Sequence, residues 1–298
     1  MTTPHTVLAL DQGITRELSL GEVVSKTFEF YRRNFVKYFV LFAVVEAIIG
    51  VVDTIAYNAF VLPTLPASAT SQQVINWLPG FFGTLAELVA VVGVVTLVFG
   101  TIAFGGTIKM ASEEIENRPV DLGASVRFAV SKMLWMWVLG LILGIIVGLG
   151  LIALIVPGII LGIMFVVAFQ ALLIENKGVI GSLSRSRELV GHRWGKTFAT
   201  FLVIGIIVGA VSIVIGLVSS PFGPASRLVS DILGAFVQPI LPVATTVYFY
   251  SNRARISPAQ PGQAAVMPAP GMKFCTNCGT QLEVSATFCS KCGAKQPT

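Results

Sequence analysis

Long apolar segments with few charges occupy most of this chain and restrict what it can fold into. Of its 298 residues, 54% are hydrophobic and only 12% are charged, whereas soluble domains carry about 25% charged residues. A helix of about 20 apolar residues crosses the hydrocarbon core of a bilayer. We therefore predict an all-α integral membrane domain over residues 1–255, with six transmembrane helices near 36–61, 83–107, 134–156, 158–174, 197–218 and 231–250.

The third and fourth predicted helices are separated only by Val156-Pro157-Gly158. A Pro-Gly pair inside an apolar run marks a turn or a helix break. One kinked helix covering both segments is the alternative, but it would be about 60 Å long, roughly twice the hydrocarbon thickness. We therefore predict a tight hairpin between these two helices.

The basic residues fall on one side of the predicted helices. Of the 20 Lys and Arg residues, 19 lie in the N-terminal segment, the second and fourth connections, and the tail, and Arg227 is the exception. The positive-inside rule assigns the side rich in Lys and Arg to the cytoplasm. This predicts a multi-pass protein of the cell membrane with both termini in the cytoplasm, which requires an even number of spans.

Three segments that precede odd-numbered spans have apolar residues at helical spacing: 19–33, 121–133 and 179–190. The first opens with Ser19-x-x-Glu22, which is the pattern of a capping box, and the second begins at Asp121, a suitable N-cap. Each segment leads into basic or aromatic residues, so we predict amphipathic helices that lie in the membrane interface. The alternative is that they are ordinary cytoplasmic connectors.

All four cysteines of the chain lie near its C-terminus, in the pattern Cys275-x2-Cys278-x10-Cys289-x2-Cys292. Two knuckles of this spacing bring four thiolates to one ion in a closed tetrahedral site. We predict a structural Zn²⁺ in a ribbon over residues 273–298. A redox dithiol pair and two disulfides are the alternatives, and a reducing cytoplasm argues against disulfides. The preceding residues 256–272 are rich in Pro and Ala and predict a flexible linker.

The predicted ribbon is too small to fold by apolar burial alone, so we expect metal binding to supply its folding free energy. Phe274 and Phe288 each precede a knuckle, and we expect them to pack together as a minimal core. The tail has no dense basic stripe with interleaved aromatic residues, so we do not expect nucleic-acid binding. The segment resembles the short zinc ribbons at the ends of many prokaryotic proteins, and contact with a cytoplasmic protein partner is the expected use.

Three carboxylates lie within the predicted spans. Glu46 and Asp53 are seven residues apart and share a face of the first span, and Glu87 lies near the outer start of the second. An acidic residue at the centre of a span costs about 2.5–3.5 kcal/mol on insertion scales, so such residues are protonated or face a wet cavity. They form a candidate polar site for protons or cations. The alternative is a structural role in contact with nearby polar residues, namely Thr54, Asn58 or Gln170.

One segment carries a family resemblance: Glu175-x2-Gly178-x2-Gly181-Ser182-Leu183-x2-Ser186-x2-Leu189-x-Gly191-x2-Trp194. Together with Leu20-Gly21-Glu22 and Val247-Tyr248-Phe249-Tyr250, it resembles the integral membrane domain named after glycerophosphoryl diester phosphodiesterases. The resemblance implies a six-span prokaryotic membrane domain over about residues 18–255. Arg187 departs from the family pattern, in which an aromatic residue is frequent at that position. Phosphodiesterase activity is not implied, because we find no room for the separate domain that carries it in that family.

The sequence contains no glycine-rich phosphate loop, nucleophile elbow or metal-binding histidine pair, so we do not expect an enzyme. Two functions remain as hypotheses. The first is a membrane scaffold or regulatory protein whose cytoplasmic zinc ribbon recruits a protein partner. The second is a small transporter or lipid-handling protein that uses the intramembrane acids. The sequence does not indicate an oligomeric state.

Overall fold

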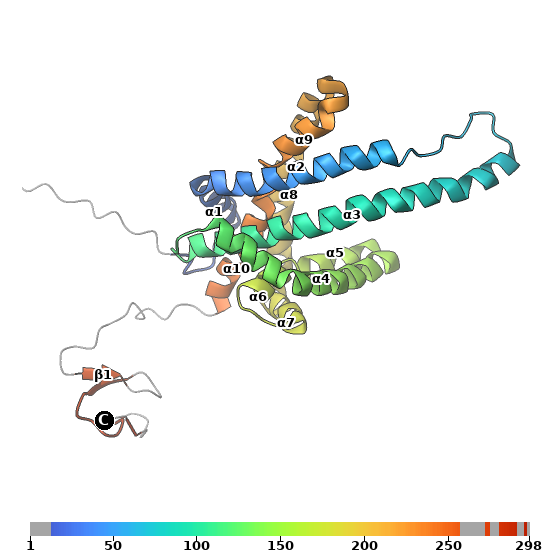
Figure 1. Cartoon of the computed structure of the whole chain (residues 1–298). Coiled ribbons are helices and arrows are strands. Elements are labelled where there is room, and N and C mark those ends of the chain that lie inside the picture. Colours follow the sequence, from blue (N-terminus) through green and yellow to red (C-terminus); the bar gives the residue numbers. More distant parts are fainter. Residues whose placement is uncertain (1–12, 257–271, 275–279, 291–294, 297–298) are drawn as a thin grey trace, which may run out of the picture. The chain divides into compact units, whose positions relative to one another are not determined.

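The computed structural model describes residues 13–256, 272–274, 280–290 and 295–296. It divides into two compact units, Met1–Ser257 and Pro258–Thr298. In the described residues the first unit is helical, and the second contains two short strands (Figure 1). Residues 257–271, which hold most of the predicted linker, lie outside the described residues.

The first unit is built from helices of very different length. In chain order they are α1 (Leu20–Arg33), α2 (Phe35–Ala59), α3 (Ser71–Ile115), α4 (Leu122–Ala153), α5 (Ile155–Met164), α6 (Ala168–Leu173), α7 (Val179–Val190), α8 (Trp194–Ser219), the 3-10 helix η1 (Ser220–Ala225), α9 (Ser226–Gly234) and α10 (Ile240–Ile256). Within the described residues, five stretches are long and apolar enough to cross a membrane: Phe35–Ala59, Ser71–Ile115, Leu122–Ala153, Ile155–Leu173 and Trp194–Gly223. Most of their apolar surface is exposed, as expected of helices that face lipid. The prediction of a multi-pass, all-α membrane protein is confirmed, with five candidate membrane stretches among the described residues.

The predicted caps form at the starts of two helices. The Glu22 N–H donates to Ser19 Oγ at 3.3 Å, and the Ser19 N–H donates to Glu22 Oε2 at 2.8 Å, which completes the capping box of α1. Asp121 Oδ1 accepts a hydrogen bond from the Ala124 N–H at 2.7 Å at the start of α4. These bonds satisfy N–H groups that have no partner inside the helix.

Only two of the three predicted amphipathic segments are separate helices. Segments 19–33 and 179–190 form α1 and α7, but 121–133 is the first part of α4 and continues into the membrane helix without a break. The prediction of a separate helix there was wrong. The junction consists of good helix formers, namely Lys132, Met133 and Leu134, whereas α1 ends before Asn34. In α1 the apolar face, which includes Val23 and Phe30, is buried against protein, mainly α10.

The predicted hairpin between the third and fourth spans is confirmed, but its turn lies earlier than Pro157-Gly158. Helix α4 ends at Ala153, Leu154 is extended, and α5 begins at Ile155. Pro157 is tolerated in the first turn of α5, where an N–H has no helical partner. Gly158 instead lies against α4, where a Cβ atom would be 2.4 Å from Leu151 Cγ and 2.7 Å from Leu151 N.

The predicted sixth span, 231–250, does not form one continuous helix. Helix α9 ends at Gly234, and the chain turns before α10 begins at Ile240. Pro242 fits there because it lies in the first turn of α10. Helix α10 is enclosed by protein on nearly all sides, with Phe249 fully buried. Its apolar residues therefore form a protein core and not a lipid-facing surface, and the count of six membrane helices is not confirmed.

Polar side chains of α10 connect it to several other elements. The hydrogen bonds are Gln170–Thr245 at 2.6 Å, Thr197–Tyr248 at 2.6 Å, Ser112–Tyr250 at 2.8 Å, and Leu18 N–Ser251 Oγ at 2.8 Å. Buried polar groups in proteins are normally paired in this way. The bonds hold the ends of α3, α6 and α8 together around α10, and they bring the stretch before α1 to the same end of the unit as the end of α10.

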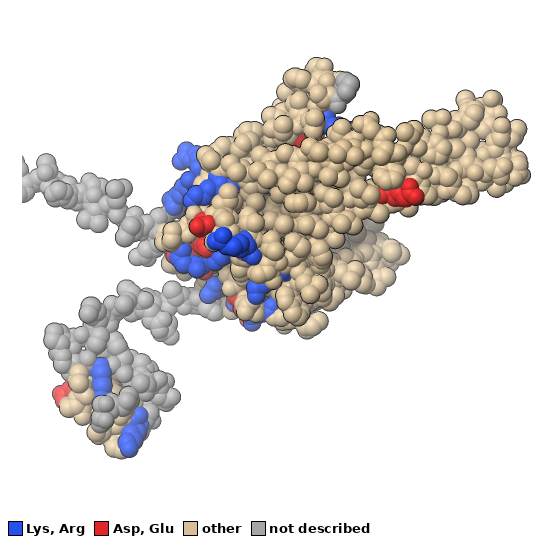
Figure 2. All heavy atoms as spheres, in the orientation of Figure 1, with Lys and Arg blue, Asp and Glu red and all other residues tan. Residues whose placement is uncertain are grey.

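Lys and Arg side chains gather at the end of the helical unit that carries α1 and α10, while the long arm formed by α2 and α3 is almost free of charge (Figure 2). We call this the basic end. Leu18, before α1, and Ser251, in α10, are hydrogen-bonded there, so these two parts of the chain lie at the same end of the unit. The assignment of the basic end to the cytoplasm stays a prediction.

A cluster of charges at the basic end ties the stretch before α1 to α8 and α10. The Glu17 carboxylate accepts a hydrogen bond from Lys196 Nζ at 2.5 Å and another from Arg193 Nη2 at 3.2 Å, and it lies 3.9 Å from Arg255 Nε. Burial pushes the pKa of Glu17 upward, but the Lys196 hydrogen bond and the three cations outweigh burial and lower this pKa below its usual value.

Replacing Glu17 by Gln should therefore destabilise the helical unit at neutral pH by about 1 kcal/mol. A carboxylate with a lowered pKa in the folded state stabilises the protein above its unfolded pKa, and this stabilisation is lost as the pH falls through the folded value. Thermal unfolding of the purified protein in detergent, at pH 7 and about pH 3, would measure the difference. Glu283→Gln in the other unit serves as the control. An effect of Glu17→Gln that is equal at both pH values would contradict the prediction.

Candidate functional site

Two antiparallel pairings shape the C-terminal unit. Strand β1 (Met272–Phe274) pairs with β2 (Gln281–Glu283), and the first Cys-x-x-Cys knuckle belongs to the connection between them. Phe288 and Lys295 form a second antiparallel bridge, and the second knuckle belongs to the residues that they enclose. Each predicted pair of metal ligands therefore falls in a short connection closed by a backbone pairing.

The interior of this unit differs from the predicted one. Leu282 and Cys289 are buried, with exposed fractions of 6% and 3%, and Ala286 packs against them. Phe288 is 60% exposed, so the prediction that it forms the core was wrong, while the side chain of Phe274 lies outside what the structure describes. Neighbouring residues in extended chain point to opposite sides. Because Cys289 points inward, Phe288 points outward.

The predicted zinc ligands are described for one residue only. Cys275, Cys278 and Cys292 lie outside the described residues, and Cys289 is buried beside Leu282. Among the described residues of this unit, few apolar side chains other than Cys289 are buried. This fits a fold that is centred on a metal, because such a unit needs more than apolar burial to be stable. Thiolate ligands of this kind would hold Zn²⁺ in a closed site without an open position for substrate.

The three predicted intramembrane acids have different surroundings. Glu46 on α2 accepts a hydrogen bond from Gln238 Nε2 at 2.7 Å, and not from any of the polar residues expected from the sequence. Asp53 lies two turns further along α2, where its Oδ1 is buried and has no hydrogen-bond partner among the described residues. Glu87 is exposed on α3, and within the described part of the chain no hydrogen bond or ion pair joins it to the other two.

An acid that sequence reasoning did not single out, Asp231, faces α2. A Cβ atom on Gly50 would lie 3.4 Å from Asp231 Oδ2 and 3.1 Å from Leu228, so α9 approaches α2 closely at a glycine one turn from Asp53. The Arg227 guanidinium stacks over the Tyr57 ring at 4.0 Å. Asp231 was the first residue of the predicted sixth span, and only its contact with α2 relates it to Asp53.

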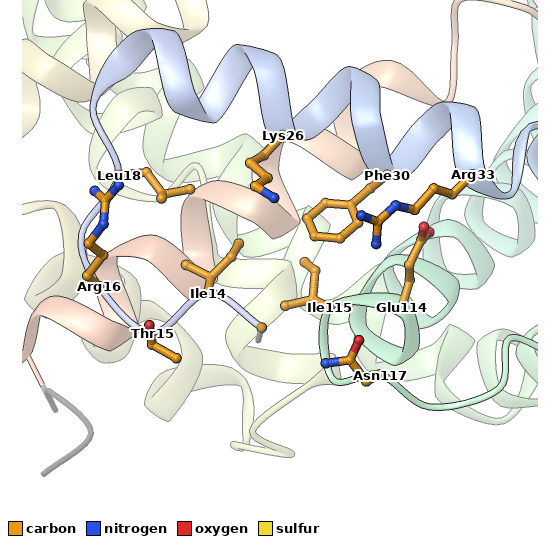
Figure 3. Close-up of a pocket in the computed structure, with 11 residues that line it drawn as sticks. Ile14, Thr15, Arg16, Leu18, Lys26, Phe30, Arg33, Glu114, Ile115 and Asn117 are labelled. Atoms are coloured by element: carbon orange, nitrogen blue, oxygen red, sulfur yellow. The ribbon is translucent and has the colours of Figure 1, made fainter. Parts of the chain in front are cut away.

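A cavity of about 230 Å³ opens at the basic end between α1, the end of α3 and the stretch before α1 (Figure 3). Lys26, Phe30 and Arg33 point into it from α1, and Glu114 lies opposite. Its cations are already paired with carboxylates: Lys26 lies 3.0 Å from Glu29, which also binds Arg33. The third cation, Arg16, is paired with Glu22. This neutralisation makes the cavity a poor site for an anion.

The Arg16–Glu22 pair also shows how strongly these charges interact. The hydrogen bond from Arg16, together with the capping bonds from Ser19, lowers the pKa of Glu22 to about 2. Glu22 therefore stays ionised at any physiological pH and keeps both roles, as the cap of α1 and as the partner of Arg16.

Comparison with known proteins identifies the C-terminal unit only. Residues 274–296 match the family model described as a zinc-ribbon domain. No curated protein and no solved structure matches the chain. The resemblance of residues 18–255 to the membrane domain named after glycerophosphoryl diester phosphodiesterases gains no support and stays a prediction. The chain thus joins a helical membrane unit of unassigned family to a zinc-ribbon domain, which implies zinc binding at its C-terminus.

Proposed function

We propose that this protein is a membrane scaffold or regulatory protein that presents a zinc ribbon to a protein partner in the cytoplasm. The observation that carries the proposal is the combination of a helical membrane unit with a zinc-ribbon domain in a separate compact unit. A ribbon closed by four thiolates has no open metal position for chemistry. Its surface, and not its metal, is then the functional part, and we propose binding without catalysis.

Two general rules favour a cytoplasmic position for the ribbon. The basic end is expected to face the cytoplasm, and thiolates stay reduced there. A sixth crossing of the membrane, which places both termini on that side, is supported by the path after α8. Arg227 contacts Tyr57, Asp231 lies by Gly50, and Gln238 binds Glu46. As the chain advances from Arg227 to Gln238, the residue that it contacts on α2 moves back from Tyr57 to Glu46. The segment after α8 therefore runs antiparallel to α2, toward the basic end.

The exposed apolar side chains of the ribbon are candidates for the partner contact. Val284 and Phe288 are 56% and 60% exposed, although the unit has few apolar residues with which to build its own interior. Large apolar and aromatic side chains that a small domain leaves in water are typical of protein interfaces. We propose that these two side chains contact the partner.

The proposal is tested by purifying the cross-linked protein from its native membrane in three forms. The Val284→Ser/Phe288→Ser variant should lose a specific co-purifying protein that wild type retains, while its zinc content stays unchanged. The Glu46→Gln/Asp53→Asn variant is the matched control in the membrane unit and should retain that protein. If the ribbon variant keeps every partner of wild type, the scaffold proposal is wrong.

A small transporter is the second candidate, and the contact between α2 and α9 favours it. Asp53 has a buried oxygen without a described partner and lies one turn from Gly50, against which Asp231 packs. Acidic residues within membrane helices mark proton or cation pathways in many membrane proteins. If the protein is a transporter, liposomes that contain it should show a proton or cation flux, and Asp53→Asn and Asp231→Asn should abolish that flux. A flux that the variants leave unchanged would exclude the pathway.

A further inference from the structure

A second cavity at the basic end differs from the one in Figure 3 in its charge. It encloses about 140 Å³ where α4 meets the turn between α6 and α7, roughly the volume of four or five water molecules. Two lysines, one amide, one aromatic ring and the backbone of a helix start surround it. The lining residues are Lys132, Trp135, Leu172, Asn176, Lys177 and Gly178.

The two lysines of this cavity are poorly neutralised. Lys132 Nζ donates to the uncharged Oδ1 of Asn176 at 2.6 Å, and among the described residues no carboxylate pairs with it. Lys177 Nζ has one acid nearby, Glu175 at 3.9 Å. That carboxylate accepts three hydrogen bonds from Arg185, at 3.0, 3.0 and 3.2 Å. The cavity therefore offers two cations whose charge is available to a ligand, unlike the cavity beside α1.

The backbone adds to this positive potential. Helix α7 begins at Val179, directly after the lining residue Gly178, and no side chain caps its first turn. The unpaired N–H groups of a helix start carry partial positive charge and favour an anion. The helix start only reinforces a site that the two lysines define.

The side chains around this cavity are of the kinds found at the level of the lipid headgroups. Trp135, Leu134 and Ile180 are exposed by 53%, 66% and 72% around it. Tryptophan is enriched where the hydrocarbon meets the headgroups, and exposed Leu and Ile next to lysines fit the same boundary. Lys132 lies near the start of the apolar part of α4, one of the five membrane stretches.

We propose that this cavity binds the phosphodiester headgroup of an anionic membrane lipid. Lys132 and Lys177 contact the phosphate, and Trp135 contacts the adjoining acyl region. Such a lipid bridges α4 and the α6–α7 turn, two elements that the Lys132–Asn176 bond already joins. This lipid site lies in the membrane unit alone, and lipid binding there does not depend on the partner of the ribbon.

Native mass spectrometry of the full-length protein in detergent tests this site. With added dioleoylphosphatidylglycerol, wild type should retain one lipid more tightly than the rest, and Lys177→Gln should weaken that binding about fivefold, as expected for one surface cation. Lys132→Gln should weaken it by a similar factor. Arg127→Gln is the matched control, because it removes one charge from the same helix outside the cavity and should leave the affinity unchanged.

Several outcomes would overturn the proposal. One is equal affinity of wild type and both lysine variants for phosphatidylglycerol. Another is equal retention of dioleoylphosphatidylcholine, which would show that the net charge of the lipid is not recognised. A third is competition by millimolar inorganic phosphate, which would identify a soluble phosphate as the ligand. Lys177→Gln keeps the Lys132–Asn176 bond, so a loss of lipid in that variant cannot be ascribed to a broken contact between α4 and the turn.

Discussion

Replacing Cys275 and Cys278 by serine should abolish stoichiometric zinc binding and unfold the C-terminal unit, while the helical unit stays intact. The described interior of the C-terminal unit consists of Leu282 and Cys289 with Ala286 against them, which is too little apolar burial to stabilise a fold. Zinc binding contributes about 10–16 kcal/mol to the folding of comparable peptides. Elemental analysis would give the zinc content of the full-length protein, and limited proteolysis would report whether the ribbon is folded.

Ser290→Ala is the control for this experiment. Ser290 is exposed and lies next to Cys289, so its replacement changes the same region without removing a thiolate and should leave one zinc per chain. Because the chain divides into two compact units, the thermal unfolding of the helical unit should be the same in all three proteins. Full zinc content in the double cysteine variant, or a ribbon that resists protease after the metal is removed, would refute the prediction.

Gly158→Ala should destabilise the helical unit by about 1–3 kcal/mol or more. The added Cβ would lie 2.7 Å from the backbone nitrogen of Leu151 and 2.4 Å from its Cγ. A flexible side chain could move aside, but the backbone of α4 cannot do so without separating the α4–α5 hairpin. Unfolding in detergent, followed by circular dichroism against temperature or denaturant, would measure the loss.

Gly144→Ala is the control, because it is expected not to destabilise the helical unit. Gly144 lies in the interior of α4, and a Cβ placed on it meets no atom within 4 Å. Alanine there should be neutral or should stabilise the helix by about 0.5–1 kcal/mol, because glycine in a helix loses more conformational entropy on folding. If Gly158→Ala and Gly144→Ala have the same effect, close contact between α4 and α5 does not limit the hairpin.

Local signals in the sequence were sufficient where the structure depends on nearby residues. The Ser19-x-x-Glu22 pattern and Asp121 predicted two helix starts, because a capping bond joins residues three apart. The Val156-Pro157-Gly158 break predicted the hairpin, although its turn lies at Leu154. The zinc-ribbon spacing likewise predicted a domain that the family comparison supports.

The contacts of the candidate sites could not be predicted in this way. Nothing in the local sequence relates Asp231 to Gly50 or Gln238 to Glu46, since these pairs meet only because α9 and the turn after it fold back on α2. The Lys132–Asn176 bond has the same origin, because it joins α4 to a turn 44 residues further along the chain. Residues that meet through tertiary packing leave no periodic or spacing signal in one sequence.

The sequence by itself determined the environment of this protein: membrane helices, basic residues at one end and a metal-binding pattern in the tail. Hydropathy and cysteine spacing suffice for this, because bilayer thickness and zinc geometry are external constraints that every chain must meet. Only the tertiary structure decided what surrounds each apolar residue. The predicted sixth span ends in α10, yet α10 is buried in protein, mainly against α1 and α3. Burial in protein and burial in lipid both remove apolar side chains from water, so the composition of a segment cannot distinguish them.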